Sequence, residues 1–261
     1  MASPSRALPA LLAAASCIWQ TPALKMTAAP HGECTCLNWA QTYASGLVMC
    51  GQGMEVGTSM SMGAPWGWAV LTDHGCNLLY PKLQANLCMK AKQGAHLYGK
   101  SAESDAYDFT WCYVSSACKH LGGGASVNDQ VSWKKCVVDE DRRYGDLHPS
   151  ELMKHVVAAG MSADPTLMTV MSYPYIYSTW DQVRPFFGND PLAKSSLEPQ
   201  LSKDLEAIVE SGRPMMICSN LDGPGNGNPD ACGPPNNVYL VVGKELWYFP
   251  HLKAPTCIQG C

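Results

Sequence analysis

The sequence has few charged residues and no block of like charge. Eighteen basic residues stand against 22 acidic ones, which gives a net charge of −4, and charged residues make up 15% of the chain. A nucleic-acid binder needs a basic stripe or patch, so nucleic acid is excluded from the expected partners. No uninterrupted apolar run reaches the roughly 18 residues that a membrane span requires. We therefore expect no membrane-spanning helix.

Familiar motifs of catalysis and metal binding are also missing. Neither Gly-x-Ser-x-Gly nor His-Glu-x-x-His occurs, so the sequence contains no serine-hydrolase elbow and no zinc-protease helix. No Cys-x-x-Cys pair occurs, which removes the usual zinc framework and the thioredoxin-type redox motif. The acceptor pattern Asn-x-Ser/Thr is absent as well, so extensive N-glycosylation is not expected. From these absences we predict no cofactor.

The N-terminal residues 1–23 have the form of a targeting peptide. They contain one cation, Arg6, no acid, and an apolar stretch from Ala7 to Ala15 that is followed by small residues. This arrangement is typical of a secretory signal peptide that is removed from the mature chain. A plastid-targeting leader of similar composition is the alternative.

Cysteine is the most informative residue type that the chain does contain. Thirteen cysteines occur, and Cys17 lies in or at the edge of the leader, so twelve are left for the mature chain. An even number is what a fully paired disulfide framework requires, and such a density is unusual in a reduced cytosolic chain. We therefore place the protein outside the cell or in the secretory lumen, with the plastid lumen as the alternative. The predicted half-cystines are Cys34, Cys36, Cys50, Cys76, Cys88, Cys112, Cys118, Cys136, Cys218, Cys232, Cys257 and Cys261.

These twelve cysteines fall into two even groups along the chain. Eight lie between Cys34 and Cys136 and four between Cys218 and Cys261, with none in between. We predict two separately closed sets of bridges, whose connectivity the sequence leaves open. Within the first set, Cys34 and Cys36 are expected to bond to different partners.

The composition and the positions of Gly, Pro and helix-capping residues predict an α+β fold. Residues 24–145 are rich in Gly, Trp, Tyr and Cys, which indicates a loop-rich, disulfide-stapled domain with short strands. Residues 146–261 are expected to form a second α+β domain, with a helical segment followed by a small α/β part that ends in a β-hairpin. In the first domain we expect a strand from Trp111 to Val114 and a helix within Pro81 to Lys92.

Helix signals recur in the second domain. Helices are predicted from Pro149 to Gly160, from Pro165 to just before Pro174, after a cap at Ser178, and from Pro199 to Gly212. A buried strand is expected at Pro214 to Cys218. The hairpin strands are predicted at Val238 to Val242 and Leu246 to Phe249.

One segment carries a resemblance to known proteins. The stretch from Cys34 to Cys136, which contains Trp111-Cys112-Tyr113-Val114 and later Trp133-x-x-Cys136, resembles cysteine-rich secreted proteins of dinoflagellate algae, and this resemblance implies no activity. It is also weakly similar to extracellular disulfide modules of the kringle and fibronectin type II kind, although the cysteine spacing departs from both. The resemblance implies a secreted or plastid-routed protein and transfers no catalytic residue.

Aromatic residues of the first domain form a candidate carbohydrate-binding site. Flat aromatic faces can stack on sugar rings, and glycans or the extracellular matrix are the partner class that we expect for a secreted protein of this kind. The alternative is that the same rings are buried against disulfides as core. The candidate residues are Trp66, Trp68, Trp111, Tyr113 and Trp133.

A second hypothesis is a secreted hydrolase with its site between the two domains. Asp139 and Glu140 belong to a short acidic cluster, and His148 follows nearby. Paired carboxylates serve in hydrolytic acid–base chemistry. The alternative is a solvated turn, because two arginines follow the acids directly.

Metal binding is a third hypothesis. Histidines lie beside cysteines at His31 and Cys34, at His74 and Cys76, and at Cys118 and His120, and zinc binding there would require free thiols. A calcium-like pattern of oxygen side chains at alternate positions occurs at Asp222, Asn226, Asn228 and Asp230, but it lacks the closing glutamate of an EF-hand. We therefore predict no resident metal and expect that loop to be an uncoordinated turn.

Overall fold

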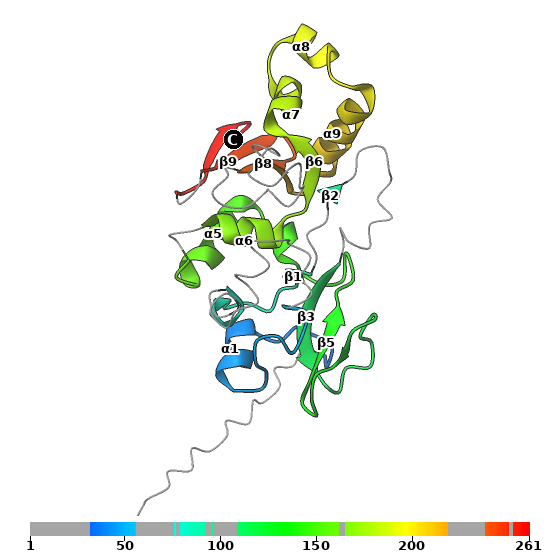
Figure 1. Cartoon of the computed structure of the whole chain (residues 1–261), viewed down its shortest axis with the longest axis vertical. Helices are drawn as coiled ribbons and strands as arrows, with labels where there is room; N and C mark the ends of the chain where they lie inside the picture. Colours follow the sequence, from blue (N-terminus) through cyan, green and yellow to red (C-terminus); the bar gives the residue numbers. More distant parts are fainter. Residues whose placement is uncertain are drawn as a thin grey trace, which may run out of the picture.

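The computed structural model describes residues 32–55, 76, 79–91, 95–96, 109–161, 165–218, 238–250 and 253–261. The described elements form an elongated arrangement, with α1, β3 and β5 toward one end, α7 to α9 at the other, and α5 and α6 between them (Figure 1). Helices and two sheets are both present, which confirms the predicted α+β class. The predicted leader at 1–23 lies outside the described residues.

Helices and strands have the following bounds. The helices are α1 (Trp39–Ala44), α5 (Pro149–Ala158), α6 (Pro165–Ser172), α7 (Trp180–Phe187), α8 (Pro191–Ser195) and α9 (Pro199–Ser211), with 3-10 turns η1 (Tyr80–Lys82) and η2 (Tyr144–Asp146). The strands are β1 (Met89–Lys90), β2 (Ala95–His96), β3 (Thr110–Ser115), β4 (Ala125–Ser126), β5 (Val131–Lys135), β6 (Tyr175–Thr179), β7 (Met215–Cys218), β8 (Val238–Val242), β9 (Glu245–Phe249) and β10 (Thr256–Gln259).

The first sheet is antiparallel, with the strand order β1-β3-β5-β4. Its central strand, β3, confirms the strand predicted from Trp111 to Val114. The helix predicted from Pro81 to Lys92 is wrong, because the described part of this segment, up to Ala91, forms η1 and then runs extended into β1. Its backbone is used in tertiary pairing instead: the Leu83 carbonyl accepts from the Ala40 amide at 3.0 Å, and β1 pairs with β3.

Four bridges close the first group of cysteines on itself. They join Cys34 to Cys118, Cys36 to Cys112, Cys50 to Cys76 and Cys88 to Cys136. The separate closure of this group and the different partners of Cys34 and Cys36 are therefore confirmed. In the second group, Cys257 bonds to Cys261. The Cys218 side chain and Cys232 lie outside the described part of the chain.

Aromatic rings fill the space around these bridges. The Trp39 ring meets the Trp111 ring edge-on with centroids 4.9 Å apart, and its indole N–H donates to the Leu87 carbonyl at 2.8 Å. Gly53 packs directly on the rings of Trp111 and Tyr113, since an added Cβ would lie 2.6 Å from Tyr113 Oη. Rings that pack edge-on contribute beyond the area that they bury, so these aromatic contacts add to the aliphatic packing of this core.

The second sheet has six strands in the order β10-β9-β8-β7-β6-β2. Strands β2, β6 and β7 run parallel, and β7 to β10 are antiparallel neighbours. Strand β7 confirms the strand predicted from Pro214 to Cys218, and β8 and β9 confirm the predicted hairpin. Strands β6 and β10 were not predicted, since β6 is a short segment between two helices and β10 is an exposed edge strand.

The helices predicted in the second domain are confirmed in α5, α6 and α9. Helix α7 begins one residue later than predicted, because Thr179 rather than Ser178 is its cap. The Thr179 hydroxyl accepts from the Gln182 amide, and the Gln182 side chain accepts in return from the Thr179 amide at 2.8 Å. This reciprocal capping box satisfies two amide donors at the helix start.

The buried side chains of the described residues form two clusters. The larger one, here called the disulfide core, includes the four bridges of the first group and continues into α5, α6 and one face of the second sheet. The smaller one, the helix–sheet core, lies between the other face of that sheet and α7 and α9. Its members are Ile176, Val183, Leu201, Leu205, Ile208, Met215, Ile217, Val241 and Leu246.

Alternation along the second sheet separates the two cores. Met216 and Leu240 belong to the disulfide core, whereas their neighbours Ile217 and Val241 belong to the helix–sheet core. Successive strand residues face opposite sides of a sheet, so this sheet is covered on both faces. The disulfide core crosses residue 145, and the boundary predicted there stays a prediction.

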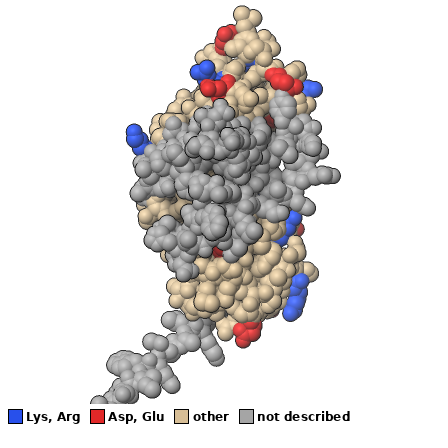
Figure 2. All heavy atoms as spheres, viewed as in Figure 1, with Lys and Arg blue, Asp and Glu red and all other residues tan. Residues whose placement is uncertain are grey.

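The described surface carries scattered charges. On the face drawn in Figure 2, several charged side chains lie near the α7–α9 end and a few at the opposite end, without a continuous patch of one sign among the described residues. None of the helices in the described ranges combines the length and the apolarity that crossing a membrane would require.

Candidate binding pocket

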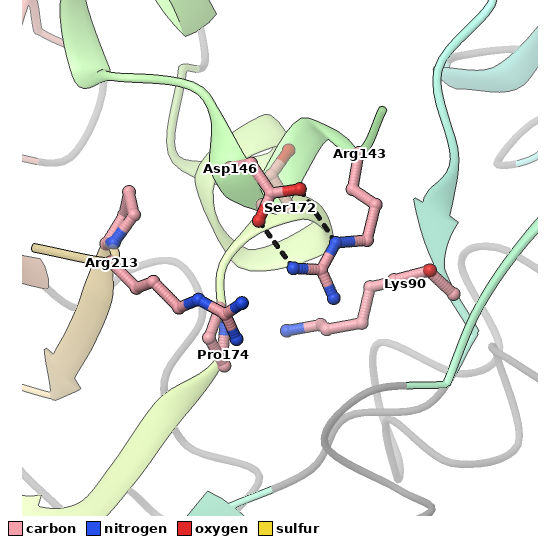
Figure 3. A pocket seen from close by; sticks show the side chains of 9 residues that line it. Lys90, Arg143, Asp146, Ser172, Pro174 and Arg213 are labelled. Carbon is pink, nitrogen blue, oxygen red and sulfur yellow. Dashed lines mark hydrogen bonds and ion pairs between the residues drawn. The ribbon is translucent and has the colours of Figure 1, made fainter. Parts of the chain in front are cut away.

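A small cationic pocket lies where the two sheets approach each other. Its volume is about 30 Å³, enough for roughly two water molecules or a small group of similar size. Three of its residues are basic and one is acidic. The lining residues are Lys90, Thr110, Arg143, Gly145, Asp146, Ser172, Pro174, Arg213 and Pro214 (Figure 3).

The first sheet supplies one wall. Lys90 in β1 and Thr110 in β3 are cross-strand partners in the antiparallel pair. Arg143 is added through a β-bridge to Cys88, just before β1, with the Cys88 amide donating to the Arg142 carbonyl at 2.9 Å. Backbone pairing therefore brings together three side chains that are far apart in the sequence.

The turn between α6 and β6 supplies the opposite wall. The Tyr173 carbonyl accepts from Lys90 Nζ at 2.7 Å, and the Tyr173 hydroxyl donates to the Leu147 carbonyl at 2.8 Å. Gly145 allows this turn to approach, because an added Cβ would lie 2.7 Å from the Ser172 carbonyl oxygen. The close contact of two backbones fixes Ser172 at the pocket.

Two arginines differ in how firmly they are held. Arg143 is 7% exposed and binds Asp146 through two nitrogens, at 2.7 and 2.6 Å. The bidentate pair fixes the guanidinium plane. Arg213 is half exposed and contacts Asp139 at 3.1 Å. Its side chain approaches from the side opposite to Lys90 and Arg143 (Figure 3), so it marks the solvent side of the pocket.

Lys90 is an unusual buried cation. Its side chain is 4% exposed, and burial lowers the pKa of its ammonium group to about 7. Desolvation penalises the charged form of a buried amine. A negative charge bound in the pocket would offset that penalty and favour the protonated form. The proton occupancy of Lys90 is therefore expected to be linked to anion binding near pH 7.

Two hydroxyl groups of the pocket lack hydrogen-bond partners. Thr110 Oγ1 and Ser172 Oγ are buried, and neither is paired within the part of the chain that the structure describes. Buried polar atoms are almost always paired, and leaving one unpaired costs about 1–3 kcal/mol. Both residues line the pocket with Lys90 and Arg143. Hydroxyl, ammonium and guanidinium groups are donor types that suit an oxyanion.

The predicted aromatic platform does not hold for two of its members. Trp111 is completely buried and Tyr113 is 1% exposed, because both rings pack inside the disulfide core. Neither presents a face to a sugar. Trp133 is partly buried and meets Phe109 edge-on at 6.4 Å. Trp66 and Trp68 lie outside the described residues.

The residues of the predicted hydrolase site have other contacts. Asp139 is an exposed partner of Arg213, and Glu140 is exposed. His148 contacts Glu245 Oε2 through Nε2 at 2.8 Å and Ser150 Oγ through Nδ1 at 2.7 Å. The Ser150 amide also donates to Nδ1, so His148 caps α5 and ties it to β9. Neither Glu140 nor His148 lines the pocket.

Glu245 is held by the same contacts. The Trp247 indole N–H donates to Glu245 Oε2 at 2.7 Å. This hydrogen bond and the one from His148 lower the pKa of the Glu245 carboxyl. The carboxylate form is therefore stabilised, which suits a structural clamp between α5 and β9.

The predicted metal ligands are distributed as follows. The cysteines of the three histidine–cysteine pairs are bridged, so they are not available to zinc in this form. His31 and His74 lie outside the described residues. The same is true of the calcium-like loop with Asp222, Asn226, Asn228 and Asp230.

None of the nine pocket residues was predicted from the sequence. Lys90, Ser172 and Arg213 belong to separate segments that meet only in the folded chain. One local signal was present, since Lys90 interrupts an otherwise apolar segment from Leu87 to Ala91. A lysine in such a segment is seldom fully buried unless it has partners.

Comparison of the chain with family models, with curated proteins and with solved structures finds no match in any of the three. The resemblance to dinoflagellate cysteine-rich proteins stays a prediction.

Proposed function

We propose that the protein is a secreted or lumenal binding protein that captures an oxyanion group in the pocket between its two sheets. The observation that carries this proposal is the pair of buried, unpaired hydroxyls, Thr110 Oγ1 and Ser172 Oγ, beside Lys90 and Arg143. Hydroxyl, ammonium and guanidinium donors are complementary to carboxylate, sulfate or phosphate oxygens. The disulfide-stabilised frame supports an oxidising compartment.

The pocket changes the kind of glycan that we propose as a partner. A neutral sugar would use aromatic faces, and two of the proposed rings are buried. An acidic glycan would instead place a sulfate or carboxylate group in the pocket, with the rest of the chain extending past Arg213. The shared chemistry is the oxyanion, and free inorganic anions present the same group.

Titration calorimetry of the purified protein tests this proposal. The probes are sodium sulfate, sodium phosphate, sodium acetate, a sulfated oligosaccharide and its desulfated counterpart. Binding of the sulfated oligosaccharide alone would identify a glycan-borne group, and binding of an inorganic anion with equal strength would identify the free ion. The proposal fails if none of the probes binds.

Two variants locate the binding. Lys90→Met removes the ammonium group at similar length, and Ser172→Ala removes one unpaired hydroxyl. We expect anion affinity to fall about tenfold or more in each, since a hydrogen bond to a charged group contributes about 1.5–3 kcal/mol. The matched control is Lys154→Met, an exposed lysine on α5. An equal loss in the control would show that binding is non-specific attraction by net charge.

Affinity should also depend on pH. Burial lowers the Lys90 pKa to about 7, and a bound anion favours the protonated form. Binding should therefore weaken as the pH rises from 6 to 9, and Lys90→Met should abolish most of that dependence. Arg143 and Arg213 remain charged throughout this range.

A further inference from the structure

Four cysteine sulfurs converge at one point of the disulfide core. They belong to the bridges Cys36–Cys112 and Cys88–Cys136, and all four lie within 4.8 Å of one another. Across the two bridges, Cys36 Sγ is 3.4 Å from Cys88 Sγ, and Cys112 Sγ is 3.9 Å from Cys136 Sγ. All four cysteines are buried. Covalent stapling alone does not require two bridges to meet.

Two of the sulfur–sulfur spacings, those between the bridges, are close to the spacing in a tetrahedral metal site. Zinc binds thiolates at about 2.3 Å, which places the sulfurs of a four-cysteine site roughly 3.8 Å apart. The two contacts between bridges already lie near that value. Only the bonded pairs have to separate, by a change in side-chain torsion. The site would be closed and dry, as structural zinc sites are.

Backbone hydrogen bonds hold three of the four cysteines, and the residue after Cys36, independently of the sulfur bonds. The Tyr144 amide donates to the Cys88 carbonyl at 3.0 Å, and the Cys136 amide donates to the Thr110 carbonyl at 2.8 Å. Cys112 pairs with Lys134 in the β3–β5 ladder, and the Leu37 amide beside Cys36 donates to Tyr113. The positions of the sulfurs therefore do not depend on the bridges alone.

We infer that the chain with these two bridges reduced holds one soft divalent cation, such as Zn²⁺, between Cys36, Cys88, Cys112 and Cys136. The site differs from the histidine–cysteine pairs considered from the sequence, and it is independent of the anion pocket. In the reduced chain the metal takes the place of the two bridges. It joins the segments before α1 and β1 to β3 and to the end of β5.

A phosphine can reduce the two bridges before zinc is added. Each bridge accepts two electrons from one phosphine and two protons from one water molecule, whose oxygen becomes the phosphine oxide. Two bridges give four thiols. Zinc then binds four thiolates, and four protons are released to the buffer.

The test uses the full chain, reduced with a phosphine without oxygen, desalted and mixed with one equivalent of Zn²⁺. Thiols are then alkylated, and the protected cysteines are identified by peptide mass spectrometry. We expect the four cluster cysteines to be protected together, with alkylation slowed about tenfold or more, while Cys34, Cys50, Cys76 and Cys118 react. Equal protection of all cysteines, or no protection, would overturn the inference whether or not the reduced chain is folded.

A pair of double variants provides the matched control. Cys88→Ser with Cys136→Ser removes two ligands, whereas Cys34→Ser with Cys118→Ser removes a bridge outside the cluster. Native mass spectrometry should show one Zn²⁺ per reduced chain for the wild type and for the second variant. The first variant should bind zinc about 100-fold more weakly. Equal zinc affinity of the two variants would contradict the assignment.

Discussion

The disulfide core and the helix–sheet core differ in the interactions that stabilise them. Around the four bridges, rings such as Trp39, Trp111 and Tyr113 fill the interior and strands are short. Between the second sheet and helices α7 and α9, aliphatic side chains such as Leu205 and Ile217 provide the core. The first arrangement restricts the unfolded chain by cross-links, and in the second the described residues contribute through the burial of aliphatic side chains.

This difference decides where the binding pocket can lie. The pocket contains a buried lysine and two unpaired hydroxyls, all of which oppose folding. Its first wall is anchored by Cys88, whose bridge to Cys136 holds the segments that carry Lys90 and Arg143. The cross-link at Cys88 therefore helps to offset the cost of burying these polar groups.

Removing the bridge next to the pocket should have the largest effect. In Cys88→Ala with Cys136→Ala, a cross-link between residues 48 positions apart is lost. The loop entropy released in the unfolded chain lowers the free energy of unfolding by about 4 kcal/mol. Urea unfolding followed by tryptophan fluorescence measures this loss. The control removes Cys257 and Cys261, whose bridge spans 4 positions and should contribute about 2 kcal/mol. Equal losses in the two variants would contradict this expectation.

Truncating the helix–sheet core tests whether the two regions are separable. Leu205→Ala removes a fully buried side chain of α9 and should cost about 3 kcal/mol. Hydrogen exchange should accelerate in β7 and β8, while amides of β3 and β5 stay protected behind their bridges. Mass spectrometry of exchanged peptides distinguishes the two sheets. Equal acceleration in β3 would show that both cores open as one unit.

The buried lysine gives the disulfide core a pH dependence of its own. Because the Lys90 pKa is lowered to about 7 on folding, the unfolded chain binds the extra proton between about pH 7 and 10. The free energy of unfolding therefore rises with pH in this range. The stability difference between wild type and Lys90→Met should shift in favour of the wild type by about 2 kcal/mol from pH 7 to 9. A constant difference would contradict this assignment.

The two regions also differ in how much of them the sequence predicts. In the helix–sheet region, local signals such as Pro199 and Gly212 mark the ends of α9, and the structure confirms them. In the disulfide region, β3 was predicted, but the segment from Pro81 to Lys92 was mistaken for a helix. Its conformation is fixed by backbone pairing with α1 and β3, contacts that leave no local pattern.

The pocket could not be predicted for the same reason. Lys90, Ser172 and Arg213 meet through sheet pairing and through the close approach of Gly145 to Ser172. Asp139 and His148 were predicted to share a site because they are close in the sequence, but in the structure they have separate contacts. Cysteine parity did predict closure of the first bridge set, because pairing within a group needs only its count.

The smallest expected effect concerns a local signal in the helix–sheet region. Thr179→Ala removes the capping box of α7 and should lower the free energy of unfolding by about 1 kcal/mol. The control is Ser178→Ala, one residue earlier, where the sequence predicted the cap but where the structure places the last part of β6. Thermal unfolding of both variants measures the difference. We expect α7 to lose helicity in the Thr179 variant and to keep it in the Ser178 variant, because the Thr179 hydroxyl is the group that accepts from the Gln182 amide. A loss of α7 helicity in the Ser178 variant alone would contradict this assignment.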